Sequence, residues 1–185
     1  MRSDGAPTLE SERIVLRPWR DDDIEAFVRI SFDPRVMEFL VQRSAEQMRE
    51  VAERCRSMLE RDGYGSWVLE IKDVAPFAGT IALQNVPFEA AFTPAMEVGW
   101  RLAAAHWGRG YATEGARLAL RFAFDVLHQE EVVALTVPAN LRSQRVMERL
   151  GMTRDPRDDF DHPRLPEGHP LRRHVLYRLA RNDAG

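Results

Sequence analysis

Apolar and polar residues alternate in several short stretches of this chain, and these stretches predict strands. In the first of them, Ile14 and Leu16 fall on one face, and the alternation stops at Pro18, which cannot donate to a strand ladder. A polar turn at Lys72 and Asp73 joins two later stretches as a hairpin or near-hairpin. The predicted strands cover residues 9–18, 66–71, 77–83, 96–102, 130–137 and 174–179.

Other stretches repeat apolar residues at helical spacing and predict helices. One follows the acidic residues 21–23, which can cap and charge a helix start. The next begins with a capping box at Ser44 and ends at Gly63, and the last ends at Gly151 with Met152 as the partner of a Schellman-type cap. The apolar stripe of the helix after Ser44 consists of Met48, Val51, Ala52, Cys55, Met58 and Leu59. The repeating residues of the helix before residue 130 are Leu118, Phe122 and Val126.

The order of these elements predicts a mixed α/β sheet with a late parallel strand pair, residues 96–102 and 130–137, joined through a right-handed crossover. Residues 154–174 contain four prolines and three histidines without periodicity, which indicates a long loop. We expect one domain over residues 1–185, with its core at about residues 9–180.

The composition changes this picture little. The 185 residues include 44% hydrophobic and 30% charged residues and carry a net charge of -3, which fits a folded domain and argues against a nucleic-acid partner. The apolar stretches are shorter than the ~20 residues of a membrane span. The opening MRSDGAPTLESER is polar and lacks a secretory pattern, so we expect a cytoplasmic protein without a membrane partner. The single Cys55 is expected to be a buried, inert thiol rather than a catalytic one.

Candidate chemistry concentrates in residues 107–115 (WGRGYATEG), where a strand leads through a glycine-containing loop into a helix. The backbone amides from Arg109 to Thr113 can point at an anion near the helix start, and phosphate suits that position. Gly108 and Gly110 permit positive φ and a close approach to a pyrophosphate, and Arg109 adds a cation. Alternatively, the glycines only make a tight connection. A P-loop is disfavoured because the segment lacks lysine, and a Rossmann fingerprint because Thr113 stands where its third glycine belongs.

Three segments share their order and spacing with one known family. They are SERIVLRP near the start, EVGWRLAAAHWGRGYATEG in the middle, and the pattern N-x-x-S-x-x-V-x-x-x-x-G-M that runs from Asn140 to Met152. The chain resembles the GNAT superfamily of N-acetyltransferases in these segments, and within it the RimJ/RimL-type protein acetyltransferases. The resemblance covers nearly all of residues 9–179. It implies a twisted, mostly antiparallel sheet with one splayed parallel strand pair, flanked by helices.

The same resemblance implies acetyl-CoA as co-substrate and no metal. Its pyrophosphate would lie on the amides of residues 108–113, and its pantetheine between strands 96–102 and 131–137. The pantetheine amides can pair with a bare strand edge near Trp100 to Leu102. The residues expected to bind acetyl-CoA are Trp100, Leu102, Gly108, Arg109, Gly110, Tyr111, Ala112, Thr113, Asn140 and Ser143.

Two positions depart from the family's pattern. Trp107 stands at the first position of [QR]-x-x-G-x-[GA], in which Gly110 and Ala112 match, and RimJ/RimL-type sequences resemble this chain there. Met147 lies four residues before the helix-ending Gly151, where many members carry a tyrosine that protonates the departing thiolate. Methionine cannot donate a proton, which leaves the identity of the general acid open.

For amine acetylation, the resemblance places a carboxylate base at Glu97, whose alternative role is a structural hydrogen bond. Ser143 is the candidate acid, with an ordinary serine of the first helical turn as the alternative. Asn140 can cap that helix, bond to pantetheine, or do both. A backbone amide around Val98 to Trp100 would meet the developing oxyanion.

The loop at residues 154–174 leaves several interpretations open. Its histidines, at positions 162, 169 and 174, match no standard zinc-ligand spacing. Its acidic run could attract a cationic acceptor, and His162 or Asp161 could act as an alternative base. The loop could equally be a solvated surface. The acidic run consists of Asp155, Asp158, Asp159 and Asp161.

The sequence thus predicts an enzyme that transfers acetyl from acetyl-CoA to a primary amine in a ternary complex. The acceptor is a protein N-terminal α-amine, as the RimJ/RimL resemblance implies, or a small molecule such as a polyamine, an amino acid derivative or an antibiotic. A homodimer is expected by family analogy alone. The alternative is a GNAT-fold module that binds or senses acyl-CoA without turnover.

Overall fold

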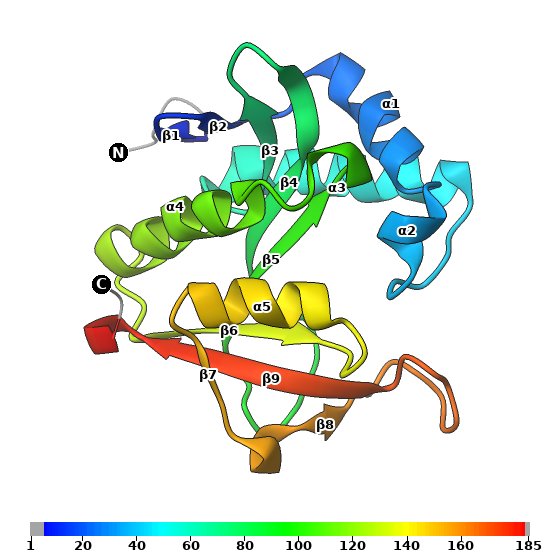
Figure 1. The fold of residues 1–185 in the computed structure, drawn as a ribbon, viewed down its shortest axis with the longest axis vertical. Coiled ribbons are helices and arrows are strands. Elements are labelled where there is room, and N and C mark those ends of the chain that lie inside the picture. Colours follow the sequence, from blue (N-terminus) through cyan, green and yellow to red (C-terminus); the bar gives the residue numbers. More distant parts are fainter. Residues whose placement is uncertain (1–5, 184–185) are drawn as a thin grey trace.

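A computed structural model describes residues 6–183 of the chain (Figure 1). The ends of the predicted domain, residues 1–5 and 184–185, lie outside the described residues. The strands are β1 (Leu9–Glu10), β2 (Ile14–Arg17), β3 (Ser66–Ile71), β4 (Ala75–Asn85), β5 (Met96–Leu102), β6 (Glu131–Thr136), β7 (Thr153–Arg154), β8 (Phe160–Asp161) and β9 (Arg173–Ala180). The α-helices are α1 (Asp21–Ile30), α2 (Pro34–Met37), α3 (Ala45–Asp62), α4 (Tyr111–Asp125) and α5 (Leu141–Arg149). Short 3-10 helices cover Ala104–His106, Pro156–Asp158 and Arg181–Asp183.

The strands form one sheet in the order β1-β2-β3-β4-β5-β6-β9-β7, with β8 paired to β9 off this path. Neighbouring strands are antiparallel except for β5 and β6, which are parallel and are paired only at Met96 with Val132 and Glu97 with Val133. Beyond Glu97 the two strands separate. The predicted fold class, a mostly antiparallel sheet with one splayed parallel pair, is therefore confirmed.

Helices cover both faces of the sheet (Figure 1). Helix α4 packs on one face, where a Cβ added at Gly115 would lie 2.8 Å from Ile81 of β4, so only glycine permits this close approach. Helices α1 and α3 pack against each other and cover the opposite face, with α3 behind the sheet in the view of Figure 1. The core between these layers is apolar and includes fully buried Trp67, Leu69 and Ile81.

The predicted helix ends are confirmed by their hydrogen bonds. Ser44 caps α3 and forms the reciprocal capping box with Gln47, and Gly63 ends that helix in the left-handed conformation with a φ of 74°. At the end of α5, the amide of Met152 bonds to the carbonyl of Met147, which is the long bond of a Schellman motif.

Several local expectations are corrected. The single strand expected at residues 9–18 is two strands, because the chain turns after Glu10 and β2 folds back on β1. Met58 is 38% exposed, since it lies at the edge of the apolar stripe of α3. Val126 is 57% exposed because α4 ends one residue before it. The loop expected at residues 154–174 contains the short strands β7 and β8, which extend the pairing of β9.

No helix within residues 6–183 is long and apolar enough to cross a membrane.

Candidate active site

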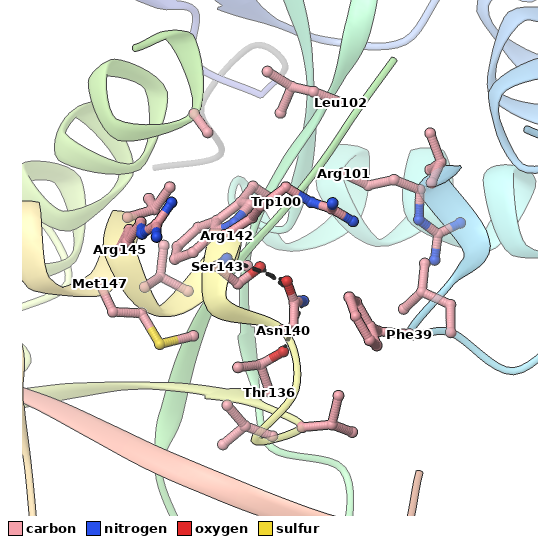
Figure 2. Close-up of a pocket in the computed structure, with 18 of the residues that line it drawn as sticks. Phe39, Trp100, Arg101, Leu102, Thr136, Asn140, Arg142, Ser143, Arg145 and Met147 are labelled. Carbon is pink, nitrogen blue, oxygen red and sulfur yellow. Dashed lines mark hydrogen bonds between the residues drawn. The ribbon is translucent and has the colours of Figure 1, made fainter. Parts of the chain in front are cut away.

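A cavity of about 620 Å³ opens where β5 and β6 separate (Figure 2). Its walls come from α2, β5, the loop before α4, the start of α5, and the segment around β8 and β9. Of the residues predicted from the sequence as catalytic or cofactor-binding, all but Arg109 line it. They are Glu97, Trp100, Leu102, Gly108, Gly110, Tyr111, Ala112, Thr113, Asn140 and Ser143.

The glycine loop forms a cradle of backbone at one end of the cavity. Gly108 and Gly110 have φ values of 74° and 84°, and Gly110 is the residue that precedes the first turn of α4. The side-chain hydroxyl of Thr113 is buried and has no hydrogen-bond partner among the described residues. A buried hydroxyl without a partner is costly, so an incoming acceptor of hydrogen bonds is favoured there. Together with the free amides of the first helical turn, it suits a bound phosphate group.

The sequence analysis missed the residue that braces this loop. Arg13, beside β2, donates from Nη1 to the carbonyl of Arg109 at 3.1 Å, and its guanidinium lies 4.9 Å from the ring centre of Tyr111. It also pairs with Glu114, whose other oxygen accepts from Ser11 at 2.7 Å. The brace joins positions about a hundred residues apart in the sequence, so no local pattern indicates it.

The side chain of Arg109, the cation predicted from the sequence, is exposed and is not part of the cavity lining. Three further arginines, Arg142, Arg145 and Arg149 of α5, line the cavity on this side. Arg142 lies over the ring of Trp107 at 4.7 Å. Spacings of three and four residues place these arginines on one helix face, which is the pattern that could have revealed them.

Asn140 and Ser143 form a small hydrogen-bond network at the start of α5 (Figure 2). Asn140 Oδ1 accepts from the amide of Ser143 at 3.2 Å and so caps the helix, which confirms its predicted capping role. Its Nδ2 donates to the hydroxyls of Thr136 at 2.9 Å and Ser143 at 3.0 Å. Because Ser143 Oγ accepts this bond, its own proton remains available to a group in the cavity.

Glu97 lies on β5 at the last position paired with β6, where the strands begin to separate. Burial raises the pKa of this carboxyl to about 7, and a hydrogen bond from Gln84, its direct partner on β4, opposes the rise. A carboxyl with a pKa near 7 is well matched to accepting a proton at neutral pH.

Comparison with known proteins identifies the family. The family model described as an acetyltransferase (GNAT) domain matches residues 13–153, which is most of the chain. The chain belongs to the GNAT acetyltransferases. It is therefore an acetyl-CoA-dependent acetyltransferase.

Relatives of known sequence and structure agree with this assignment. The FsC-acetyl coenzyme A-N(2)-transacetylase of Aspergillus fumigatus is 31% identical over an alignment of 157 residues that covers 80% of this chain and 65% of that protein. The uncharacterized protein YkkB of Bacillus subtilis is 33% identical over 78% of this chain and 84% of its own. A crystal structure of a GNAT-family acetyltransferase from Bacillus anthracis has a TM-score of 0.77 at 22% identity, covering 95% of this chain and 99% of that one. The last comparison supports the fold.

The two departures from the GNAT pattern have different structural outcomes. Trp107 donates from its indole nitrogen to the carbonyl of Leu102 at 2.9 Å, so it ties the loop to the end of β5. Met147 is only 2% exposed and packs in the core while its side chain borders the cavity. This acetyltransferase thus has a thioether, which cannot donate a proton, at the position of the frequent tyrosine.

The acidic run of the loop at residues 154–174 lies away from the cavity. None of its carboxylates is part of the lining, and each is paired with an arginine. Of the two interpretations of this run, the arrangement favours a solvated surface over the attraction of a cationic acceptor, and Asp161 does not line the cavity as a base would. The pairs are Asp155 with Arg157, Asp158 with Arg178, Asp159 with Arg154, and Asp161 with Arg172 and Arg173.

The same loop nevertheless reaches the cavity through His162, Arg164 and His174. The rings of the two histidines are 5.2 Å apart, and burial lowers the pKa of each. Within residues 6–183, no three His, Cys, Asp or Glu side chains are placed to hold a metal ion. Cys55 lies outside the lining, and burial raises the pKa of its thiol, which favours the inert role.

Proposed function

We propose that this acetyltransferase moves the acetyl group of acetyl-CoA to a primary amine by direct attack within a ternary complex. The observation that carries the proposal is the meeting of three features in one cavity. They are the backbone amides that follow Gly110, the carboxyl of Glu97 with a pKa of about 7, and the hydroxyl of Ser143, whose hydrogen has no acceptor among the described residues. We call the lining from the glycine loop, α4 and α5 the donor side, and the lining from α2, Glu97, Arg101 and residues 160–174 the acceptor side.

The donor side suits acetyl-CoA in two respects. The amides at the start of α4 and the hydroxyl of Thr113 offer hydrogen bonds to a pyrophosphate, and the arginines of α5 add positive charge. The edge of β5 from Val98 to Leu102 has no strand partner on the β6 side among the described residues. The amide groups of a pantetheine arm can complete this edge as an added strand would.

Each step of acetyl transfer can be assigned to a group that lines the cavity. Glu97 accepts a proton from the ammonium form of the acceptor, directly or through water, and leaves a neutral amine. The amine nitrogen bonds to the thioester carbon, while a backbone amide near Val98 to Trp100 stabilises the oxyanion. As the carbon–sulfur bond breaks, the nitrogen loses its second proton, and Ser143 relays a proton to the leaving sulfur, so that the amide and the thiol are both neutral. The products are an N-acetylated amine and CoA.

A protein N-terminal α-amine remains one candidate acceptor, on the strength of the RimJ/RimL resemblance in the sequence. A small amine is the other candidate. We also retain the homodimer as a prediction from family analogy.

The test is release of free CoA thiol from acetyl-CoA, with the acetylated product confirmed by mass. The panel comprises N-terminal peptides, polyamines, amino acids and aminoglycosides. Glu97→Gln and Ser143→Ala should both lose activity, whereas Arg49→Gln, a surface variant whose arginine pairs with Glu25, should not. Thiol release with one acceptor class supports the proposal. Silence with every class, while acetyl-CoA still raises the melting temperature, would overturn it in favour of a module that binds without turnover.

A further inference from the structure

Within residues 6–183, the guanidinium of Arg101 has no carboxylate partner. It lines the cavity half-buried on β5, and no described carboxylate oxygen lies within ion-pair distance of it. Its Nη1 donates to the hydroxyl of Ser31 at 3.2 Å, and its charged end lies 5.0 Å from the ring centre of Phe27. Burial lowers the pKa of Arg101, as expected when a cation is desolvated without a counter-charge.

Arg17, a buried arginine of β2, differs from Arg101 in having carboxylate partners. Arg17 is 5% exposed, and its guanidinium pairs with Asp23 and Glu70, each at 2.7 Å. Partnering of this kind is the usual condition for a buried charge, because an unpaired one is costly. Arg101 is half-buried and has no such partner among the described residues, and the space beside it is the cavity itself.

Arg101 lies on the same face of β5 as Glu97. Side chains alternate along a strand, so Glu97, Gly99 and Arg101 point to one face, with roughly 13 Å between the outer two Cα atoms. At Gly99 between them, an added Cβ would meet no atom within 4 Å. The carboxyl of Glu97, the unobstructed space above Gly99 and the guanidinium of Arg101 thus follow one another along the strand. This arrangement leaves room for a small molecule between the base and the cation.

The phosphate site proposed at the start of α4 lies on the other face of β5 from Arg101. Trp100 and Arg101 leave β5 in opposite directions, with Arg101 directed toward the side of Phe39 (Figure 2). Trp100 is the register partner of Ile81, on which α4 packs, whereas Arg101 contacts Phe27 and Ser31 of the α1 region. Arg101 therefore faces the acceptor side and not the glycine loop.

The remaining charges agree with an anionic acceptor group. Glu97 is the only carboxylate among the described lining residues, so no second acid is present to hold another ammonium group of a polyamine. On the acceptor side, Arg164 adds a cation that lies 6.0 Å from the ring centre of Phe88 and has no ion pair with a described residue. The arginines that line the cavity are Arg35, Arg101, Arg142, Arg145, Arg149 and Arg164.

We propose that the acceptor is a small amine that also carries a free carboxylate, such as an amino acid or its derivative, with the carboxylate bound by Arg101 and the amine directed to Glu97. This inference rests on the proposed acetyl transfer and narrows its acceptor. It disfavours polyamines, which carry no anion, and internal peptide N-termini, whose neighbouring carboxyl group is an amide.

Matched acceptor pairs test the proposal. Each of the L-amino acids is compared with its own α-carboxamide by CoA thiol release at saturating acetyl-CoA. The amine of a carboxamide is less basic, so more of it is neutral at pH 7, and without recognition of the carboxylate it should be the better acceptor. We expect the reverse, with the free acid of the preferred side chain favoured about tenfold to a hundredfold in kcat/KM, as a hydrogen-bonded charge pair would provide.

The variant Arg101→Gln should remove this preference by raising the KM of the free acid. The kcat/KM of the carboxamide and the KM of acetyl-CoA should each stay within about twofold of the parent values. Arg101→Lys should restore part of it, since it keeps the charge but not the fork of donors. Arg49→Gln serves as the control for loss of a surface arginine. If Arg101→Gln fails to fold, judged by its acetyl-CoA-dependent melting shift, Arg101→Lys and the acid-to-amide ratio of the parent carry the test.

The outcomes separate the two proposals. Turnover in which acids and amides are used equally, or in which polyamines or peptides are preferred, overturns this inference and leaves acetyl transfer intact. A raised KM for acetyl-CoA in Arg101→Gln with an unchanged acid-to-amide ratio would also overturn it, by assigning Arg101 to the donor. Absence of thiol release with every acceptor overturns the acetyl-transfer proposal on which it rests.

Discussion

The donor side of the cavity is made from two continuous segments, the loop that leads into α4 and the first turns of α5. The acceptor side is assembled from pieces far apart in the sequence: α2, β5, and the segment around β8 and β9. The donor side combines the free backbone amides at the start of α4 with side chains from α4 and α5, whereas the acceptor side presents side chains. Backbone amides suit a ligand part that never changes, and a site made of side chains can be adapted to different acceptors.

The largest effect should come from Glu97, which lies on the acceptor side where β5 and β6 begin to separate. Glu97→Gln keeps the shape but cannot accept a proton, so kcat/KM near pH 8 should fall about a hundredfold to ten-thousandfold. In the parent, kcat/KM should rise as pH increases through about 7, where the carboxylate forms, and the variant should lose this step. Initial rates across pH 5.5 to 9 measure both. Unchanged rates at pH 7 would remove Glu97 from the mechanism.

The same residue should show an effect on stability. Burial raises the folded-state pKa of Glu97 from its ordinary 4.5 to about 7, so folding favours the protonated form. Its ionisation therefore costs folding free energy, starting as pH rises above about 4.5 and complete above about 7, by roughly 1 to 3 kcal/mol. Glu97→Gln should be more stable than the parent at pH 8 and similar to it near pH 4.5. Urea unfolding of the parent and the variant at both pH values measures the difference in folding free energy. Equal stability of the two proteins at pH 8 would contradict the raised pKa of Glu97.

On the donor side, a matched pair of glycines tests whether the backbone cradle is specific. Gly110 precedes α4 with a φ of 84°, and Gly63 ends α3 with a φ of 74°. Gly63 is not part of the cavity lining. Alanine at either position should cost about 1 kcal/mol of folding free energy. Gly110→Ala alone should also raise the KM of acetyl-CoA, by about tenfold, because its amide and its neighbour's would turn away from the phosphates. Equal KM values for the two variants would show that the loop is only a connection.

The contrast between the donor side, made of continuous segments, and the acceptor side, assembled from distant ones, also explains which features could be predicted from the sequence. Local rules identified the capping box at Ser44, the Schellman end at Gly151 and the glycine loop, because each depends on residues a few positions apart. The strand positions of Glu97 and its neighbours followed from alternation. The brace by Arg13 and the isolation of Arg101 depend on which distant side chains come together, and periodicity does not encode that.

The smallest effect is expected in the acidic run, for which the sequence leaves open both the attraction of a cationic acceptor and a solvated surface. If the carboxylates attracted a cationic acceptor, the triple variant Asp158→Asn, Asp159→Asn, Asp161→Asn would raise the acceptor KM. Since each is paired with an arginine and none lines the cavity, the KM should stay within about twofold, and stability should fall by about 0.2 to 1 kcal/mol per lost pair.

Salt distinguishes the two explanations for the acidic run further. Ion pairs at the surface weaken as ionic strength increases, so the stability difference between parent and triple variant should shrink in 1 M salt. Loss of these carboxylates also leaves Arg154 and Arg173 without their acidic partners near the acceptor side, while Arg178 keeps its ion pair with Glu131. If the acceptor carries a carboxylate, this added positive charge should lower its KM slightly at low salt, and a cationic acceptor should show the opposite sign. The direction of that small change therefore tests, without touching Arg101, which charge the acceptor side is built to receive.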